Sequence, residues 1–189
     1  MPHGSLHGLL ERPDLPRGLI LLVRAHHAPA DTIITTHLVS CGYAVFGVEL
    51  LTSQEAHFAD ATQNVPRLSQ RLIDILDLIR HDGDMQDLPL AVFANGDTAP
   101  AAIRAAAQRD TQIKALACHG GLVDRAGLQA LNLLVAPLLM IFDADDAIGQ
   151  AAFQRAASHL GCRHQTHVLE LGEDPVMPAT GWFVRQLGS

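Results

Sequence analysis

The sequence predicts an α/β fold, a three-layer α/β/α sandwich built around a mostly parallel sheet. Short apolar segments of strand length alternate with segments of helical periodicity along nearly the whole chain, which is the pattern of repeated β-α-β units. Most apolar segments are continuous rather than alternating, as expected of strands that are buried on both faces. Right-handed crossovers then place helices on both faces of the sheet.

Size and composition limit the classes of protein that remain. The 189 residues, 48% apolar and 17% charged, suit one globular domain spanning residues 1–189. No apolar run reaches the roughly 20 residues of a membrane span, and the N-terminus lacks the features of a signal peptide. We therefore expect a cytoplasmic protein with no membrane partner. A net charge of −7 without a basic stripe argues against nucleic acid. Cys41, Cys118 and Cys162 form no CxxC pair, which predicts reduced, buried thiols.

Seven segments are predicted strands because they are short, mostly apolar and bounded by turn residues. In chain order they are residues 6–10, 18–23, 43–49, 90–94, 113–118, 137–142 and 164–169. The first is short and lies near the N-terminus, so it is expected at an edge of the sheet.

The predicted helices are recognised by their caps and their apolar stripes. They are residues 31–40, 64–81, 100–107, 127–134, 149–160 and 180–187. Asp31 and Asn64 are expected N-caps, and Gly42 and Gly161 are expected C-terminal stops. Residues 50–63 are predicted to be a polar connection.

The most informative stretch follows the apolar run of residues 90–94. Asn95, Gly96 and Asp97 form a sharp turn there, and Pro100 falls in the first turn of an alanine-rich helix, where its missing N–H is harmless. A strand, a tight turn and a helix with small neighbours have the shape of a nucleophile elbow. The expected nucleophile position is Gly96. We therefore predict a hydrolase-like scaffold without a nucleophile, with Gly96 at a strained, positive-φ position that suits glycine.

The chain resembles the small dienelactone-hydrolase-like proteins of the α/β-hydrolase fold. Residues 17–23 resemble the first central strand of that family, and residues 41–52 resemble its segment "aGxatlllDLLT". Residues 88–107 resemble "LPigyfGaStGaaaal" without a gap, and His119-Gly-Gly and residues 138–145 resemble the next two strand ends. The resemblance spans almost the whole chain and implies a minimal α/β-hydrolase fold without a lid domain.

The same resemblance implies a degenerate catalytic triad. It places the family's nucleophile on Gly96 and its acid on Asp145, which is retained. The family's histidine falls near Asp174 or Pro175, and no histidine follows there. The glycine-rich oxyanion loop corresponds to residues 25–29, which contain no glycine. Nucleophile, base and oxyanion donors act as a unit, so serine-type acyl transfer is not expected.

Two forms of relocated hydrolase chemistry remain as alternatives. Asp97 also fits the elbow pattern, shifted by one residue, and aspartate is the nucleophile in dehalogenase-like members of this fold. That chemistry needs a base, and Asp97 is interpreted first as a cap of the helix at Pro100. The second alternative is a metal ion held by His26, His27 and His119, since imidazoles are good ligands. No HxH or HExxH spacing supports it, so we expect no metal and no cofactor.

Ligands of parallel sheets bind beyond the carboxyl ends of the strands. The predicted pocket therefore comprises His26, His27, Asn95, Gly96, Asp97, His119 and Asp145. Asp143, Asp145 and Asp146 crowd one strand end and are interpreted as solvated acids and a helix cap. The function that follows is a pseudo-hydrolase that binds a small-molecule ligand or a protein partner, and a homodimer is compatible with it.

Overall fold

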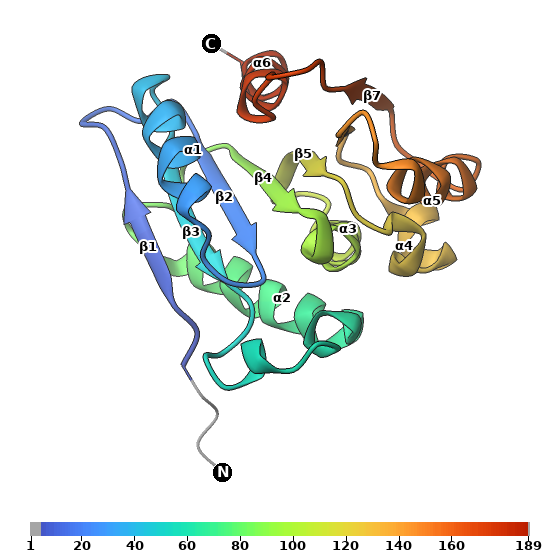
Figure 1. Cartoon of the computed structure of the whole chain (residues 1–189). Coiled ribbons are helices and arrows are strands. Elements are labelled where there is room, and N and C mark those ends of the chain that lie inside the picture. Colours follow the sequence, from blue (N-terminus) through green and yellow to red (C-terminus); the bar gives the residue numbers. More distant parts are fainter. Residues whose placement is uncertain (1–4, 189) are drawn as a thin grey trace.

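The computed structural model describes residues 5–188, which form a seven-stranded sheet with helices on both faces (Figure 1). The strands are β1 (Gly8–Glu11), β2 (Leu19–Arg24), β3 (Ala44–Glu49), β4 (Leu90–Asn95), β5 (Ile113–His119), β6 (Leu138–Phe142) and β7 (His164–Val168). Their order is β1-β3-β2-β4-β5-β6-β7. Only β1 is antiparallel to its neighbour, and the other pairs are parallel. The predicted α/β class with a mostly parallel sheet is confirmed.

The helices form two outer layers that enclose separate apolar cores. One layer contains α1 (Pro29–Ser40) and α6 (Val176–Leu187), and the other contains α2 (Val65–His81), α3 (Ala99–Gln108), α4 (Leu128–Leu133) and α5 (Ala147–Ala157) (Figure 1). Successive residues of β2 pack into different cores. Leu22 packs into the core on the α1 and α6 side, and Leu21 packs into the core on the α2 and α3 side. None of the helices within residues 5–188 has the length and apolar character that a bilayer span requires.

Burial decreases from the centre of the sheet to its edges. Every residue of β2 and β6 is buried, whereas most residues of β1 and β7 are exposed. This gradient explains the sequence pattern, because strands covered on both faces need continuous apolar runs. The edge strand β7 is correspondingly polar, with the sequence His-Gln-Thr-His-Val.

Among the predicted helix starts that are wrong by a few residues, two reflect a carboxylate that acts from an unexpected position. The helix expected to be capped by Asp31 begins at Pro29, and Asp31 lies inside its first turn, where Oδ2 accepts the Ala28 N–H at 2.8 Å. The last helix begins at Val176 rather than near residue 180, and Asp174 Oδ1 accepts the Val176 N–H at 2.9 Å. Both acids satisfy backbone donors that would otherwise be free.

The helix predicted over residues 149–160 begins at Ala147 and ends at Ala157, so Gly161 is not its C-terminal stop. Several other predicted caps and stops are confirmed. Asn64 caps α2 by accepting the Arg67 N–H at 3.1 Å. Gly42 follows α1 in the left-handed region, with φ of 91°, as a C-terminal glycine does. Asp146 caps α5 by accepting the Gly149 N–H at 2.8 Å.

The connection between β3 and α2 is fastened by Glu55. This carboxylate accepts two hydrogen bonds from Arg71, at 2.8 and 2.9 Å, a third from the Thr52 N–H at 2.9 Å, and forms an ion pair with Arg67. The bond to Arg71 is the main cause that lowers the pKa of Glu55 to about 2 from 4.5. Bidentate arginine–carboxylate pairs are among the stronger polar contacts in proteins, so Glu55 holds this connection against α2.

We predict that Glu55→Gln lowers the free energy of unfolding by about 2 kcal/mol at neutral pH. Since the folded pKa is depressed, the carboxylate stabilises the fold above pH 4.5, and this contribution disappears as the pH falls through 2. Urea unfolding at pH 7 and pH 3 should therefore show a smaller difference between variant and wild type at the lower pH. The exposed Glu170→Gln is the matched control, and a pH-independent difference would contradict the assignment.

Candidate functional site: the elbow after β4

The sharp turn after β4 is built from small and buried groups. The chain passes from β4 through a 3₁₀ turn, η3 (Gly96–Thr98), directly into α3. Thr98 is fully buried, and its hydroxyl donates to the Asn95 carbonyl at 2.7 Å, which closes the turn. Gly121, after β5, packs against the turn so closely that a Cβ there would collide with the Gly96 carbonyl oxygen and the Ala99 side chain.

The predicted strain at Gly96 is wrong. Gly96 is not among the glycines with positive φ, whereas Gly120 and Gly121 are, at 69° and 104°. The reason is that Asn95 is extended and Gly96 enters the 3₁₀ turn at once, so the turn needs no left-handed residue. A Cβ on Gly96 would meet only the His119 carbonyl oxygen at 3.7 Å and the Gly121 nitrogen at 3.8 Å, which are ordinary contact distances. Position 96 can therefore accommodate a side chain.

A hollow of about 320 Å³ opens beside the elbow, between α3, the N-terminus of α5 and the start of α2. Its lining includes Gly96, Asp97, Gly121, Arg125 and Ile148. We call it the elbow hollow. Asp97 is exposed there and does not cap the following helix, because neither η3 nor α3 has a side-chain cap bond. The predicted capping role of Asp97 is wrong, and its carboxylate is left on the rim of the hollow.

The positions that the resemblance assigned to the acid and the base do not complete a triad with Gly96. Asp145 is exposed and lies outside the lining of the elbow hollow. Pro175 is the residue that precedes α6 and has no titratable group. No imidazole is among the residues that line the elbow hollow.

The predicted pocket residues are dispersed over several places. Gly96 and Asp97 line the elbow hollow, and His27 lines a different hollow beside α1. His119 Nε2 pairs with Asp143 Oδ1 at 3.1 Å. His26, Asn95 and Asp145 are exposed and belong to neither hollow.

A shared metal site for the histidines finds no support in the geometry. Across residues 5–188, no three histidine, cysteine or acidic side chains are grouped so that they could hold a metal ion. His27 instead lies 3.8 Å from Asp31, and His119 has Asp143 as its partner.

A buried ion pair that was not predicted from the sequence lies at the end of β2. Arg24 and Asp31 are each only 6% exposed, and Arg24 Nε donates to Asp31 Oδ1 at 2.7 Å. The Arg24 guanidinium also lies 5.3 Å from the centre of the Phe93 ring. Burial lowers the pKa of Arg24, and the bond to Asp31 acts in the opposite direction. A charged residue at the end of an otherwise apolar run, with an acid seven residues later, was the available signal.

A second ion pair that was not predicted from the sequence, between His167 and Glu173, lies near α6. His167 Nε2 is 2.8 Å from Glu173 Oε1, and a hydrogen bond from the backbone N–H of Glu170 is the main cause that lowers the pKa of Glu173.

Cys118 is fully buried, which raises the pKa of its thiol far above the usual range. Cys41 and Cys162 are half-buried, and all three cysteines are free.

Three solved structures are similar to this chain over nearly its whole length. A dienelactone hydrolase from Anabaena variabilis superimposes with a TM-score of 0.85 and 26% identity, over 97% of this chain and 93% of that chain. Est1E from Butyrivibrio proteoclasticus gives a TM-score of 0.74 at 10% identity, over 97% and 95% of the two chains. A carboxylesterase from Bacillus cereus gives 0.70 at 17% identity, over 96% and 94%. No protein-family model matches the sequence.

A curated relative is longer than this chain. A Mycobacterium tuberculosis protein named "Putative phosphoribosyl transferase" is 28% identical over 95% of this chain. The match covers 44% of that protein, so the chain spans less than half the length of its relative. The name of the whole relative therefore says little about the part that is shared.

The elbow geometry predicts opposite effects for two serine substitutions. Gly96→Ser should change the free energy of unfolding by no more than about 0.5 kcal/mol, because its Cβ has room and its backbone is unstrained. Gly121→Ser should lower it by about 2 kcal/mol or more, since both the positive φ and the contact with Gly96 disfavour a side chain. Urea unfolding of the two variants measures the difference. Equal destabilisation would show that the elbow has a different backbone conformation.

Proposed function

Because the chain has the α/β-hydrolase fold and is dienelactone-hydrolase-like in structure, we propose that it binds a small molecule at the elbow hollow without serine-hydrolase chemistry. The observation that carries this proposal is Gly96 itself. The turn that would present a nucleophile is intact and has space for a side chain at position 96, yet glycine supplies no hydroxyl or thiol there, and the Thr98 hydroxyl is buried and bonded to the Asn95 carbonyl.

The surroundings of Gly96 support the proposal. Acyl transfer by a serine or cysteine needs an imidazole to accept its proton and N–H groups to stabilise the oxyanion. No histidine lines the elbow hollow. The loop after β2, which corresponds to the family's oxyanion loop, has its Ala28 N–H already committed to Asp31 at 2.8 Å. That donor is therefore not free for a substrate oxyanion.

The lining of the elbow hollow has groups that can bind a small-molecule ligand. Gly96 and Gly121 leave backbone accessible on one wall, Ile148 and Pro100 supply apolar surface, and Arg125 supplies a positive charge. A concave site with mostly apolar walls and a few polar groups is the usual form of a small-molecule site. The volume of about 320 Å³ suits a compact ligand.

The second candidate is a hydrolase in which Asp97 is the nucleophile. It is favoured by one observation, the exposed carboxylate that Asp97 places on the hollow without a capping role. Hydrolysis of the resulting ester needs a base that activates water, and the lining of the hollow supplies no imidazole. We therefore rank this candidate below ligand binding.

A fluorophosphonate probe and a series of p-nitrophenyl esters test the absence of serine chemistry. We expect no labelled serine and ester hydrolysis at the background rate, with an active serine hydrolase as positive control. Gly96→Ser should not create activity, because no imidazole lines the elbow hollow beside the new hydroxyl. Labelling of a serine together with ester turnover in the wild type would refute the proposal, and turnover lost in Asp97→Asn would support the second candidate.

Ligand binding at the elbow hollow is tested by filling it. In a fragment screen by NMR, we expect hits that shift the amide signals of Asp97 and Gly121. These hits should be lost in Gly96→Leu, whose side chain enters the hollow, and kept in Leu171→Ala, whose side chain is fully exposed. Hits that persist in Gly96→Leu, or none at all, would argue against this site.

A further inference from the structure

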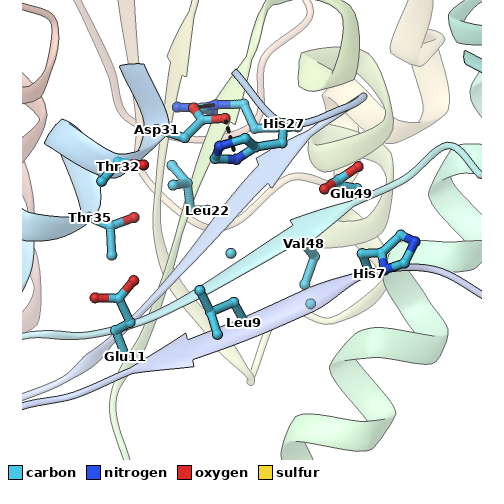
Figure 2. Close-up of a pocket in the computed structure, with 13 residues that line it drawn as sticks. His7, Leu9, Glu11, Leu22, His27, Asp31, Thr32, Thr35, Val48 and Glu49 are labelled. Carbon is cyan, nitrogen blue, oxygen red and sulfur yellow. Dashed lines mark hydrogen bonds and ion pairs between the residues drawn. The ribbon is translucent and has the colours of Figure 1, made fainter. Parts of the chain in front are cut away.

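A second hollow lies at the other side of the sheet, between the edge strand β1, strand β3 and helix α1 (Figure 2). We call it the edge hollow. Its volume is about 220 Å³, and none of its lining residues also lines the elbow hollow. This volume is below the range of about 300–1,000 Å³ that is typical of pockets for drug-sized ligands. The edge hollow therefore suits a ligand smaller than a typical drug molecule.

The strand register explains why this hollow exists. Leu9 of β1, Gly47 of β3 and Leu22 of β2 lie side by side across the three strands. Because Gly47 has no side chain, the middle of this apolar row is open, and a Cβ there would meet nothing closer than the Leu9 carbonyl oxygen at 3.9 Å. Leu9 is 66% exposed, which shows that α1 leaves β1 uncovered on this face.

Carboxylates stand at the two ends of the apolar row. Glu11 lies beside Val45, and Glu49 lies four residues further along β3, beside Arg24. Four residues of a strand span about 13 Å, and Figure 2 shows Glu11 and Glu49 at opposite ends of the hollow with Leu9 and Leu22 between them. Within residues 5–188 neither carboxylate takes part in an ion pair.

The positive charge nearest to this site is already neutralised. Arg24 is bound to Asp31 at 2.7 Å, and Asp31 also accepts the Ala28 N–H. The Arg24–Asp31 pair is therefore close to neutral. The other titratable side chains of the lining are the carboxylates of Glu11 and Glu49 and the imidazoles of His7 and His27, so the formal charge at pH 7 with neutral histidines is negative. The site thus attracts cations and repels anions.

We propose that the edge hollow binds a short linear organic dication, an aliphatic chain with an ammonium group at each end. One ammonium pairs with Glu49 and the other with Glu11, and the methylene groups lie over Leu9, Gly47 and Leu22. Thr32 and Thr35 project from α1 toward the hollow (Figure 2), and their hydroxyl oxygens can accept further ammonium hydrogens. This combination matches both the charged ends and the apolar middle of the ligand.

Calorimetric titration with 1,5-diaminopentane tests the proposal, beside diamines of three to eight carbons, pentylamine and 1,5-pentanediol. We expect saturable binding of a diamine with a Kd below about 1 mM, and binding about tenfold weaker for the monoamine, which has one charge-assisted contact instead of two. The diol should not bind. Glu11→Gln and Glu49→Gln should each weaken diamine binding about tenfold, and Glu170→Gln should leave it unchanged.

Gly47→Val provides an independent steric test, because its side chain would fill the hollow without altering charge. We expect it to abolish diamine binding while circular dichroism and the Tm stay close to wild type, since β-branched residues suit a strand. If Gly47→Val does not fold, the two surface glutamine variants still decide the matter. No saturation at 10 mM diamine, binding that survives all three variants, or preferential binding of glutarate would overturn the proposal.

Discussion

Burial of the central strands on both faces is the constraint on which both hollows depend. From β2 to β6 the strand interiors are apolar and covered by helices on each side, so they offer no place for a polar group or a ligand. Polar side chains can appear only where the strands end or where the covering layer ends. The elbow hollow is of the first kind, at the carboxyl end of β4, and the edge hollow is of the second, where α1 leaves β1 uncovered.

The Arg24–Asp31 pair shows how strictly this constraint acts. Arg24 is the last residue of β2 and is buried, so its charge needs a partner inside the protein. Removing one member of a buried pair typically costs about 3–5 kcal/mol, because the other charge is then left without compensation. Asp31 provides the partner and also accepts the Ala28 N–H. One carboxylate therefore stabilises the end of β2, the start of α1 and the loop between them.

The sequence alone was sufficient to predict those features that depend on local interactions. The order of strands and helices, the cap at Asn64 and the stop at Gly42 all depend on neighbouring residues. It failed where a residue's role depends on a distant partner. Asp31 was interpreted as a cap alone, although it is also the ion-pair partner of Arg24 at the end of β2. His26, His27 and His119 were assigned to one pocket because their strands end at the same edge, but His27 lines the edge hollow and the other two line neither hollow.

The sequence by itself determined the fold class and the position of the sharp turn between β4 and α3. These follow from hydrophobic periodicity and turn chemistry, which act over a few residues. Only the tertiary structure decided the backbone conformation of Gly96, the pairing of Arg24 with Asp31 and the hollow over Gly47. Each of these depends on which side chains from separate elements meet, and sequence spacing does not specify such contacts. The row of Leu9, Gly47 and Leu22 comes from three strands, so the open space in its centre exists only once the strands are in register.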